Sequence, residues 1–192
     1  EFITMTGRDD YGWAMSSYFG RLSYNFKERY MLTAVVRRDG STNFGPANRY
    51  AIFPSLSAGW ILSQEDFMAA VPQINYLRLR GSWGQNGNQN IGAFQYLAGV
   101  EYVGANYPFG PDYTDNTVGS QLANLPNPNV RWETSEQLNF GIDFNLFESK
   151  LQTTFDWYNK QTIDWLLVAP VLLTAGAPAP YSNGGSVSNI GI

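Results

Sequence analysis

Segments of about ten residues in which apolar and polar side chains alternate recur along this sequence of 192 residues. In three segments, one series of alternate positions is apolar or aromatic and the other is largely polar; they are residues 18–26, 77–84 and 137–144. Successive side chains of a β-strand point to opposite faces, so each segment would form a strand with one apolar face and one polar face. This pattern is typical of a transmembrane β-barrel, whose strands face lipid on one side and a polar lumen on the other.

The composition supports a membrane setting without a helical span. Aromatic residues make up 16% of the chain, with 12 Tyr, 12 Phe and 6 Trp, and charged residues make up only 15%. Tyr and Trp concentrate where a protein crosses the boundary between water and lipid. The sequence has no run of about 18 or more apolar residues, which excludes a transmembrane helix. Alternating strands, in contrast, are compatible with the mean hydropathy of -0.27.

Residues that carry most enzymatic and metal chemistry are scarce. The sequence has no Cys and no His, which removes thiol nucleophiles, the commonest general base and the commonest transition-metal ligand. Glu133 and Glu136 lie three positions apart in an expected strand and point to opposite faces, so they cannot flank one glycosidic bond. Residues 112–116 offer oxygen ligands but lack the Gly and the distal Glu of a calcium loop, which favours a solvated turn. We therefore expect no enzymatic activity, no cofactor and no metal site.

Charge and the N-terminal residues bear on partners and processing. The net charge is -4, from 12 basic and 16 acidic residues, and no basic run occurs, which argues against nucleic acid as a partner. Residues 1–6 lack the charged start and the apolar core of a signal peptide. An exported barrel must carry such a peptide, so we expect these residues to come from inside a longer protein.

The expected strands are joined by connections of alternating length. Strands are expected at about residues 16–26, 30–38, 55–62, 76–85, 132–146 and 151–160, with the start of a seventh at 187–192. Long loops rich in Gly, Asn, Ser or Pro are expected at about 39–50, 86–130 and 161–186, short connections at 27–29 and 147–150, and one of intermediate length at 63–74. Outer-membrane barrels keep short turns on the periplasmic side and long loops outside, so the three long loops should face the medium.

Two local signals mark the ends of expected strands. Asp39-Gly40 is a strong turn signal, which predicts that the second strand ends there. Residues 63–66 have the Ser-x-x-Asp pattern of a helix start, and Pro72 should stop whatever helical turn forms.

Several blocks of residues are typical of one family when taken in their order along the chain. They are Tyr18-Phe19-Gly20-Arg21-Leu22-Ser23-Tyr24-Asn25, Arg37-Arg38-Asp39-Gly40-Ser41, Phe53-Pro54-Ser55, Leu79-Arg80-Gly81-Ser82-Trp83-Gly84, Asn127-Pro128-Asn129-Val130-Arg131-Trp132 and Phe155-Asp156-Trp157-Tyr158-Asn159-Lys160. Together they resemble the SusC/RagA family of TonB-linked outer-membrane transporters. The resemblance implies an all-β, antiparallel transmembrane β-barrel of about 22 strands that encloses a plug, of which this chain supplies about six or seven.

The resemblance also implies a function and a set of partners. It places the parent protein in the outer membrane as an importer of glycan oligosaccharides, peptides or other bulky nutrients. In this family, a surface lipoprotein of the SusD kind covers the barrel as a lid, and the TonB complex supplies energy through the N-terminal part. No plug and no TonB-contacting segment are recognisable, so we expect residues 1–192 to be a part of the barrel wall that cannot transport alone.

Five charged residues at polar positions of the expected strands are candidates for contact with the plug or a ligand; they are Arg37, Arg78, Arg80, Asp143 and Asp156. Arg78 and Arg80 could grip a plug or an anionic substrate from the fourth strand. The favoured alternative is general lumen polarity, in which neighbouring acids such as Asp143 or Asp156 balance their charge. For Arg37, local ion pairing in a turn is favoured over ligand contact.

Aromatic residues of the longest loop are the second set of candidates; they are Tyr96, Tyr102, Tyr107, Phe109 and Tyr113. An aromatic ring offers an apolar plane beside a polar group, which suits stacking on sugar faces. The same rings could instead stiffen the loop or dock it to the lid lipoprotein, and this packing role is favoured.

Two other classes of protein remain as alternatives. A soluble β-sandwich that binds carbohydrate would also show alternation, but the insert of about 45 residues fits poorly with its turns every 8 to 12 residues. A structural outer-membrane barrel or adhesin would share the strands but lack transport. The N-terminal sequence of the parent protein would separate the latter, because a transporter needs a plug.

Overall fold

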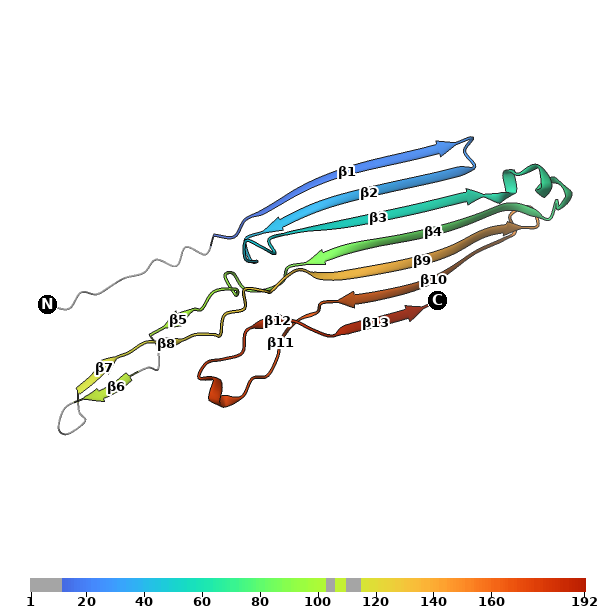
Figure 1. Cartoon of the computed structure of the whole chain (residues 1–192). Helices are drawn as coiled ribbons and strands as arrows, with labels where there is room; N and C mark the ends of the chain where they lie inside the picture. Colours follow the sequence, from blue (N-terminus) through green and yellow to red (C-terminus); the bar gives the residue numbers. More distant parts are fainter. Residues whose placement is uncertain (1–11, 103–105, 110–114) are drawn as a thin grey trace.

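The computed structural model describes residues 12–102, 106–109 and 115–192, and its main element is one antiparallel sheet of seven strands (Figure 1). The strands are β1 (Met15–Phe26), β2 (Tyr30–Ser41), β3 (Tyr50–Ile61), β4 (Ile74–Asn88), β9 (Glu133–Leu146), β10 (Leu151–Ile163) and β13 (Ser186–Gly191). They lie side by side in this order, and β1 and β13 form the two open edges. The predicted all-β, antiparallel fold is confirmed, and the sheet does not close on itself.

The second strand is longer than the sequence pattern predicts. The expectation that Asp39-Gly40 ends the strand is wrong, because Asp39 pairs with both Ser17 and Ala51 and β2 continues to Ser41. The carboxylate of Asp39 is buried and forms an ion pair with Arg37, with 2.6 Å between Arg37 Nη2 and Asp39 Oδ2. Gly40 leaves the space that the ring of Tyr50 occupies, so two residues typical of turns are accommodated within a ladder.

Two tight turns and the connection of intermediate length at 62–73 lie at one end of the sheet. The tight turns, at 27–29 and 147–150, contain non-glycine residues with positive φ, which fits the twist of hairpin turns. Between β3 and β4 lie two 3-10 helices, η1 (Leu62–Gln64) and η2 (Asp66–Ala70), so the expected helical turn forms, although neither has a side-chain cap. Hydrogen bonds from Phe147 N to Gln73 O and from Ser149 N to Asn75 Oδ1 join the last turn to this connection.

The opposite end of the sheet carries the loop 42–49 and two much longer connections. The loop is shorter than the expected 39–50, because β2 extends to Ser41, and it is also shorter than the 62–73 connection. The insert after β4 forms a narrow ribbon in which β5 (Val100–Glu101) pairs with β8 (Gln121–Leu122) and β6 (Asn106–Phe109) pairs with β7 (Asp115–Val118). Figure 1 shows this ribbon extending away from the sheet like an arm. The passage after β10 contains β11 (Leu166–Val168), η3 (Leu173–Ala175) and β12 (Tyr181–Asn183).

A small apolar cluster joins the parts of these connections that lie next to the sheet. Its buried members are Phe44, Phe53, Ile91, Val130 and Trp132. The ring of Trp132 lies 5.1 Å from that of Phe44 and 5.7 Å from that of Phe53, and its indole donates to Arg49 O at 3.1 Å. Side chains from β3, the β2–β3 loop and the segment before β9 therefore share one core at this end.

The main sheet has no packing partner among the described residues, where the other sheets are two-stranded. Many large apolar side chains on its strands are exposed, such as Leu22, Phe140 and Phe155. A β-sandwich would cover one face of this sheet with a second sheet. The described residues contain no such second layer, which argues against the β-sandwich alternative. No helical turn in the described residues is long and apolar enough to cross a membrane.

Candidate functional site

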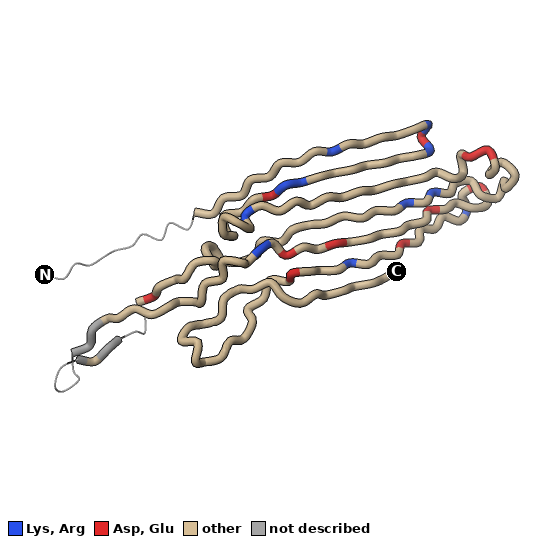
Figure 2. The backbone as a smooth tube through the Cα atoms, viewed as in Figure 1, with Lys and Arg blue, Asp and Glu red and all other residues tan. Residues whose placement is uncertain are grey.

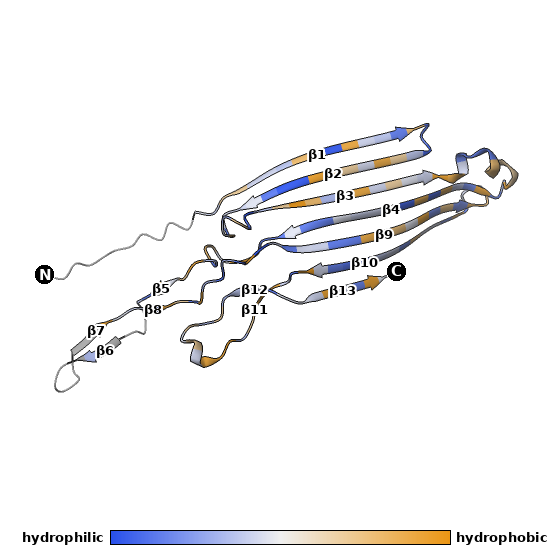
Figure 3. Cartoon of the chain, viewed as in Figure 1, coloured by the Kyte–Doolittle hydropathy of each residue, from blue (hydrophilic) through white to orange (hydrophobic). Residues whose placement is uncertain are grey.

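The strand register sorts the side chains of the sheet onto two faces of opposite character. Figure 3 shows hydrophobic and hydrophilic residues interspersed along the strands. One row crosses six strands at a single level and consists of Ser23, Thr33, Ser57, Ser82, Asn139 and Tyr158. Asn139 Nδ2 donates to Ser82 Oγ at 3.1 Å, and Gln137 Nε2 donates to Asn139 Oδ1 at 2.7 Å. We call this side of the sheet the polar face and the other side the apolar face.

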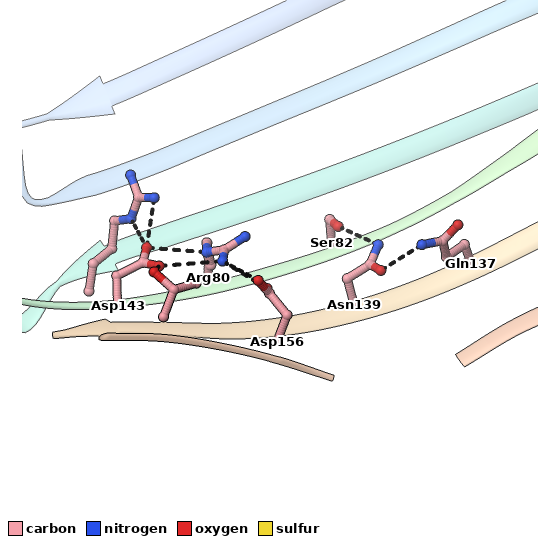
Figure 4. Close-up of polar contacts among 8 residues, drawn as sticks. Arg80, Ser82, Gln137, Asn139, Asp143 and Asp156 are labelled. Atoms are coloured by element: carbon pink, nitrogen blue, oxygen red, sulfur yellow. Dashed lines mark hydrogen bonds and ion pairs between the residues drawn. The ribbon is translucent and has the colours of Figure 1, made fainter. Parts of the chain in front are cut away.

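Four charged residues form a compact network on the polar face (Figure 4). Asp143 on β9 lies opposite Arg78 on β4, with 2.8 Å between Arg78 Nη2 and Asp143 Oδ2. Arg80 donates to the same carboxylate and also reaches Asp156 on β10, with 2.7 Å between Nη2 and Oδ1. Thr154 Oγ1 donates to Asp143 Oδ1 at 3.0 Å. Figure 2 shows the basic and acidic residues close together where β4, β9 and β10 run side by side.

Gly141 makes this network possible. It lies in register between Arg80 and Asp156, one strand from each. A Cβ atom at this position would lie 2.7 Å from Arg80 Nε and 2.7 Å from Asp156 Oδ1. The guanidinium therefore crosses β9 only because the strand has no side chain there.

The charged network borders a shallow trough on the polar face. Two hollows, of about 300 and 490 Å³, share the side chains of Thr33, Ser57, Ser82 and Asn139 and together form what we call the polar trough. Arg78 and Arg80 line one end, and Arg21 and Arg37 line the other. Hydroxyl and amide groups form its floor, so it can exchange hydrogen bonds with a polar molecule or segment.

Three of the four arginines that line the trough form ion pairs with carboxylates, and the fourth, Arg21, does not within the described residues. Arg78 and Arg80 are matched by Asp143 and Asp156, in agreement with the charge-balanced interpretation, and Arg37 pairs with Asp39. Arg21 donates to Ser23 Oγ at 3.3 Å and has no carboxylate partner within the described part of the chain. Contact of any of these residues with a plug or a ligand stays a prediction.

The apolar face is bounded at both ends by aromatic and charged groups. Near the short turns, the rings of Tyr24, Phe26, Tyr30 and Trp60 form a row with centroid separations of 6.4, 6.3 and 6.1 Å. Near the long loops, the guanidinium of Arg38 lies over the ring of Tyr50 at 4.2 Å. Between Tyr30 and Arg38, β2 runs for about 26 Å at about 3.3 Å per residue. Aliphatic and aromatic side chains occupy this interval.

Glu65, in the connection between β3 and β4, binds the aromatic row. Its Oε1 accepts hydrogen bonds from Tyr30 Oη at 2.6 Å and from Trp60 Nε1 at 3.0 Å, and its Oε2 lies 3.3 Å from Arg29 Nη1. The Tyr30 hydroxyl is the main cause, followed by the Trp60 indole, of a pKa for Glu65 below its ordinary value of 4.5. Because Tyr30 and Trp60 belong to the apolar face, the carboxylate lies on that side of the sheet.

The predicted loop aromatics take different positions. Tyr96 packs against the buried cluster, and its ring lies 6.3 Å from that of Phe94. Tyr102 is exposed in the arm. Tyr107 and Phe109 belong to β6, but their side chains lie outside the described residues, as does all of Tyr113 and most of the 112–116 segment. Contact of these residues with sugar or a lid remains a prediction.

Gly141, Thr154, Arg21 and Glu65 are functional residues that the sequence pattern does not single out. The 147–150 turn sets the hairpin register and could have placed Thr154 opposite Asp143 and Gly141 opposite Asp156. The pairing of Arg80 with Gly141 joins β4 to β9 across the long insert, and no local signal predicts it.

An open antiparallel sheet with one apolar and one polar face, with its two tight turns at one end and its two longest connections at the other, is a segment of a β-barrel wall. A sequence profile described as "TonB dependent receptor-like, beta-barrel" matches residues 4–192. The chain therefore belongs to the TonB-dependent receptor β-barrel family, whose members are outer-membrane proteins rather than enzymes.

Individual relatives agree with this assignment. The chain is 36% identical over 190 residues to TonB-dependent receptor P39 of Formosa agariphila and 36% identical over 180 residues to TonB-dependent receptor SusC of Bacteroides thetaiotaomicron. These alignments cover 98% and 92% of this chain but 17% and 18% of the relatives. A solved structure of the RagAB peptide transporter superposes with a TM-score of 0.78 at 30% identity, covering 93% of this chain and 19% of that one. The chain thus spans less than a fifth of the length of these relatives.

Proposed function

We propose that this chain is part of the barrel wall of a TonB-dependent outer-membrane transporter that imports glycan oligosaccharides or other bulky nutrients. The observation that carries the proposal is the apolar band with aromatic margins. The interval between Tyr30 and Arg38 is about 26 Å along β2, which a strand tilt of about 40° reduces to about 20 Å across the membrane. This height accounts for most of the roughly 25 Å apolar band of outer-membrane barrels, which aromatic girdles flank on both sides. The apolar face would thus meet lipid, and the polar face would line the lumen.

In this arrangement, the polar trough faces the space through which a nutrient passes or in which a plug sits. Its floor of hydroxyl and amide groups can donate and accept hydrogen bonds, as sugar hydroxyls and peptide groups require. Arg21 offers a cation that no carboxylate in the described residues neutralises, which would suit a partner with a carboxylate or a carbonyl group. The balanced network of Arg78, Arg80, Asp143 and Asp156 would serve mainly to hold the wall in register.

The long loops would meet the outside partners. The arm formed by β5 to β8 protrudes beyond the sheet and carries exposed apolar side chains, among them Val100, Tyr102 and Val118. A lid lipoprotein of the SusD kind is the partner that this arm would contact, with the loop aromatics as docking or sugar-stacking groups. Energy would come from the TonB complex acting through another part of the protein.

A second candidate substrate class is peptides. The similarity to a peptide transporter, at a TM-score of 0.78, supports it, and the resemblance of the sequence to the SusC/RagA family supports oligosaccharides. Both classes are long, polar and hydrogen-bonding, so the trough accommodates either without a change in its chemistry.

Uptake by the complete protein would test the proposal. The full-length transporter and its lid lipoprotein would be produced in a strain that lacks its own homologues, with and without a functional TonB. Fluorescent oligosaccharides and peptides of matched size would then be offered. We expect TonB-dependent accumulation of at least one class. A protein that assembles in the outer membrane and binds its lid, yet neither binds nor accumulates either class, would favour the structural barrel.

A further inference from the structure

The connection between β3 and β4 is bonded to the apolar side of the sheet through one residue, Glu65. Its Glu65 is hydrogen-bonded to Tyr30 and Trp60, both members of the aromatic row on the apolar face. The η1 and η2 helices that flank Glu65 therefore lie at the margin of the band that would meet lipid. A connection of this kind is well placed to contact the membrane surface.

This connection exposes large apolar side chains that the sheet does not cover. Phe67 on η2 is 61% exposed, and Val71 directly after η2 is 38% exposed. The charged residues of the segment are the acidic pair Glu65 and Asp66. An exposed Phe is one of the side chains by which segments insert into the interface between headgroups and acyl chains. The basic groups that usually accompany such a side chain are absent from residues 62–73, so a cation must come from a neighbouring turn.

A cation lies along the same margin. Lys27, in the turn between β1 and β2, has its Nζ 5.4 Å from the centroid of the Phe26 ring, which is part of the aromatic row. The margin thus carries an ammonium at Lys27, and the exposed Asp66 directly follows Glu65, which is bonded to the same aromatic row. These charges complement a headgroup that combines a phosphate with an ammonium group.

Below this margin the apolar face is hollowed. A groove of about 770 Å³ is lined by the rings of Tyr24, Tyr30, Trp60 and Phe140, together with Leu32 and Leu79. The small residues Ala58 and Gly81 also line it, between these larger side chains. An apolar groove that begins at the aromatic margin and runs into the band has the character of a seat for an acyl chain.

We infer that the η1–η2 connection and the groove below it form a docking site for a phospholipid of the periplasmic leaflet with a phosphoethanolamine headgroup. Lys27 would bind the phosphate, Asp66 would bind the ammonium, Phe67 and Val71 would enter the interface, and one acyl chain would occupy the groove. Glu65 acts as a positioning residue that holds the connection against the aromatic row. The inference rests on the proposed membrane setting of the barrel, and its test separates the two.

Depth measurements on the complete barrel in vesicles test the position of the connection. These 192 residues contain no Cys, so a single spin label can be placed at Phe67→Cys after any cysteine elsewhere in the protein is replaced by Ser. Phe140→Cys on the apolar face reports embedding of the barrel, and Val118→Cys in the arm, 66% exposed in the structure, is a water-exposed control. The vesicles contain phosphatidylethanolamine and phosphatidylglycerol at a ratio of about three to one.

We expect the labels at 140 and 67 to be more accessible to oxygen than to a nickel chelate, with 67 shallower than 140, and the label at 118 to show the reverse. A label at 140 that behaves like water would overturn the membrane setting itself. A label at 140 in lipid with one at 67 in water would overturn the docking site alone.

Native mass spectrometry tests the headgroup. The charge-removing double variant Lys27→Gln with Asp66→Asn should retain at least threefold less phosphatidylethanolamine than the wild type, with no change for phosphatidylglycerol. The matched control is Glu148→Gln with Lys150→Gln, which removes the same two charges from a neighbouring turn at the same end, where both side chains are highly exposed. Equal retention in both double variants, or a wild type that prefers phosphatidylglycerol, would show that the site does not recognise this headgroup.

Discussion

Arg80 on β4 is joined to Asp156 on β10 across an intervening strand, with 2.7 Å between Nη2 and Oδ1. The bridge passes over Gly141, where β9 has no side chain to obstruct it. Because Arg80 also donates to Asp143 on β9, one guanidinium connects three adjacent strands. A network of this kind fixes register, since a slip of β9 by one residue would move Asp143 to the other face.

The glycine at the crossing point provides a sharp test. Gly141→Val should force Arg80 or Asp156 out of position and destabilise the complete barrel by about 1 to 3 kcal/mol, the usual cost of overpacking. Urea unfolding of the barrel in vesicles, followed by heat-modifiable gel migration, would measure it. The matched control is Gly81→Val on β4, an interior strand, where a Cβ atom would make only ordinary contacts of 3.5 Å with the ring of Phe140. Equal effects of the two substitutions would show that the crossing is not a packing constraint.

Adjacent positions on opposite faces should respond differently to exchange of charge. Leu79→Arg places a cation on the apolar face and should cost about 2 to 4 kcal/mol if that face meets the bilayer midplane. Arg80→Leu should cost less, because Asp143 keeps its ion pair with Arg78 and Asp156 is half-exposed. Folding yields of the two variants in liposomes would compare them. Equal losses, or the reverse order, would mean that the faces are assigned wrongly.

Glu65 should make the short-turn end sensitive to acid. The Tyr30 hydroxyl and the Trp60 indole hold the folded-state pKa of Glu65 below its ordinary value of 4.5, so ionised Glu65 favours the folded protein. This contribution is present above the unfolded-state pKa and is lost as the pH falls through the folded-state pKa. Glu65→Gln should therefore lower the unfolding midpoint at pH 7, and the gap to the wild type should close in acid below pH 4.5.

Unfolding midpoints from pH 7 down to pH 3 would follow that gap. Glu148→Gln, at a highly exposed position in a nearby turn, is the control and should track the wild type throughout. A gap for Glu65→Gln that stays constant across the pH range would mean that the lost contact is not titrating.

The strands could be predicted because alternation is a local property of the sequence. Residues 137–144, for example, show their two faces without any knowledge of their neighbours, and β9 contains this segment. What could not be predicted depends on contacts between distant residues. Asp39-Gly40 has the local signature of a turn, but pairing with Ser17 and Ala51 on flanking strands overrides it. The same holds for the buried cluster, where Phe44 meets Trp132 only after three connections have folded together.

The candidate site could likewise be predicted only in part from the sequence. The polar positions of Arg78, Arg80, Asp143 and Asp156 follow from alternation, and the hairpin turn at 147–150 is enough to bring β9 beside β10. The pairing of β4 with β9 spans the whole long insert, so its register and the role of Gly141 are visible only in the folded sheet. The position of Glu65 on the apolar side depends on the path of a connection without strand periodicity, for which the sequence has no comparable signal.

The arm between β4 and β9 should be separable from the wall. Replacing residues 100–122 by a short Gly/Ser link in the complete protein removes β5 to β8 but keeps Tyr96, which packs on the buried cluster. Assembly should be unchanged, because the arm lies beyond the end of the sheet, whereas substrate capture or binding of the lid lipoprotein should weaken at least tenfold. Heat-modifiable migration, ligand titration and pull-down of the lid would report assembly, substrate capture and lid binding, respectively.

Tyr96→Ala alone is the converse control: it should loosen the packing of the loop on the buried cluster while leaving the arm in place. A shortened protein that assembles, holds its lid and binds substrate with unchanged affinity would show that the arm is a passive connection.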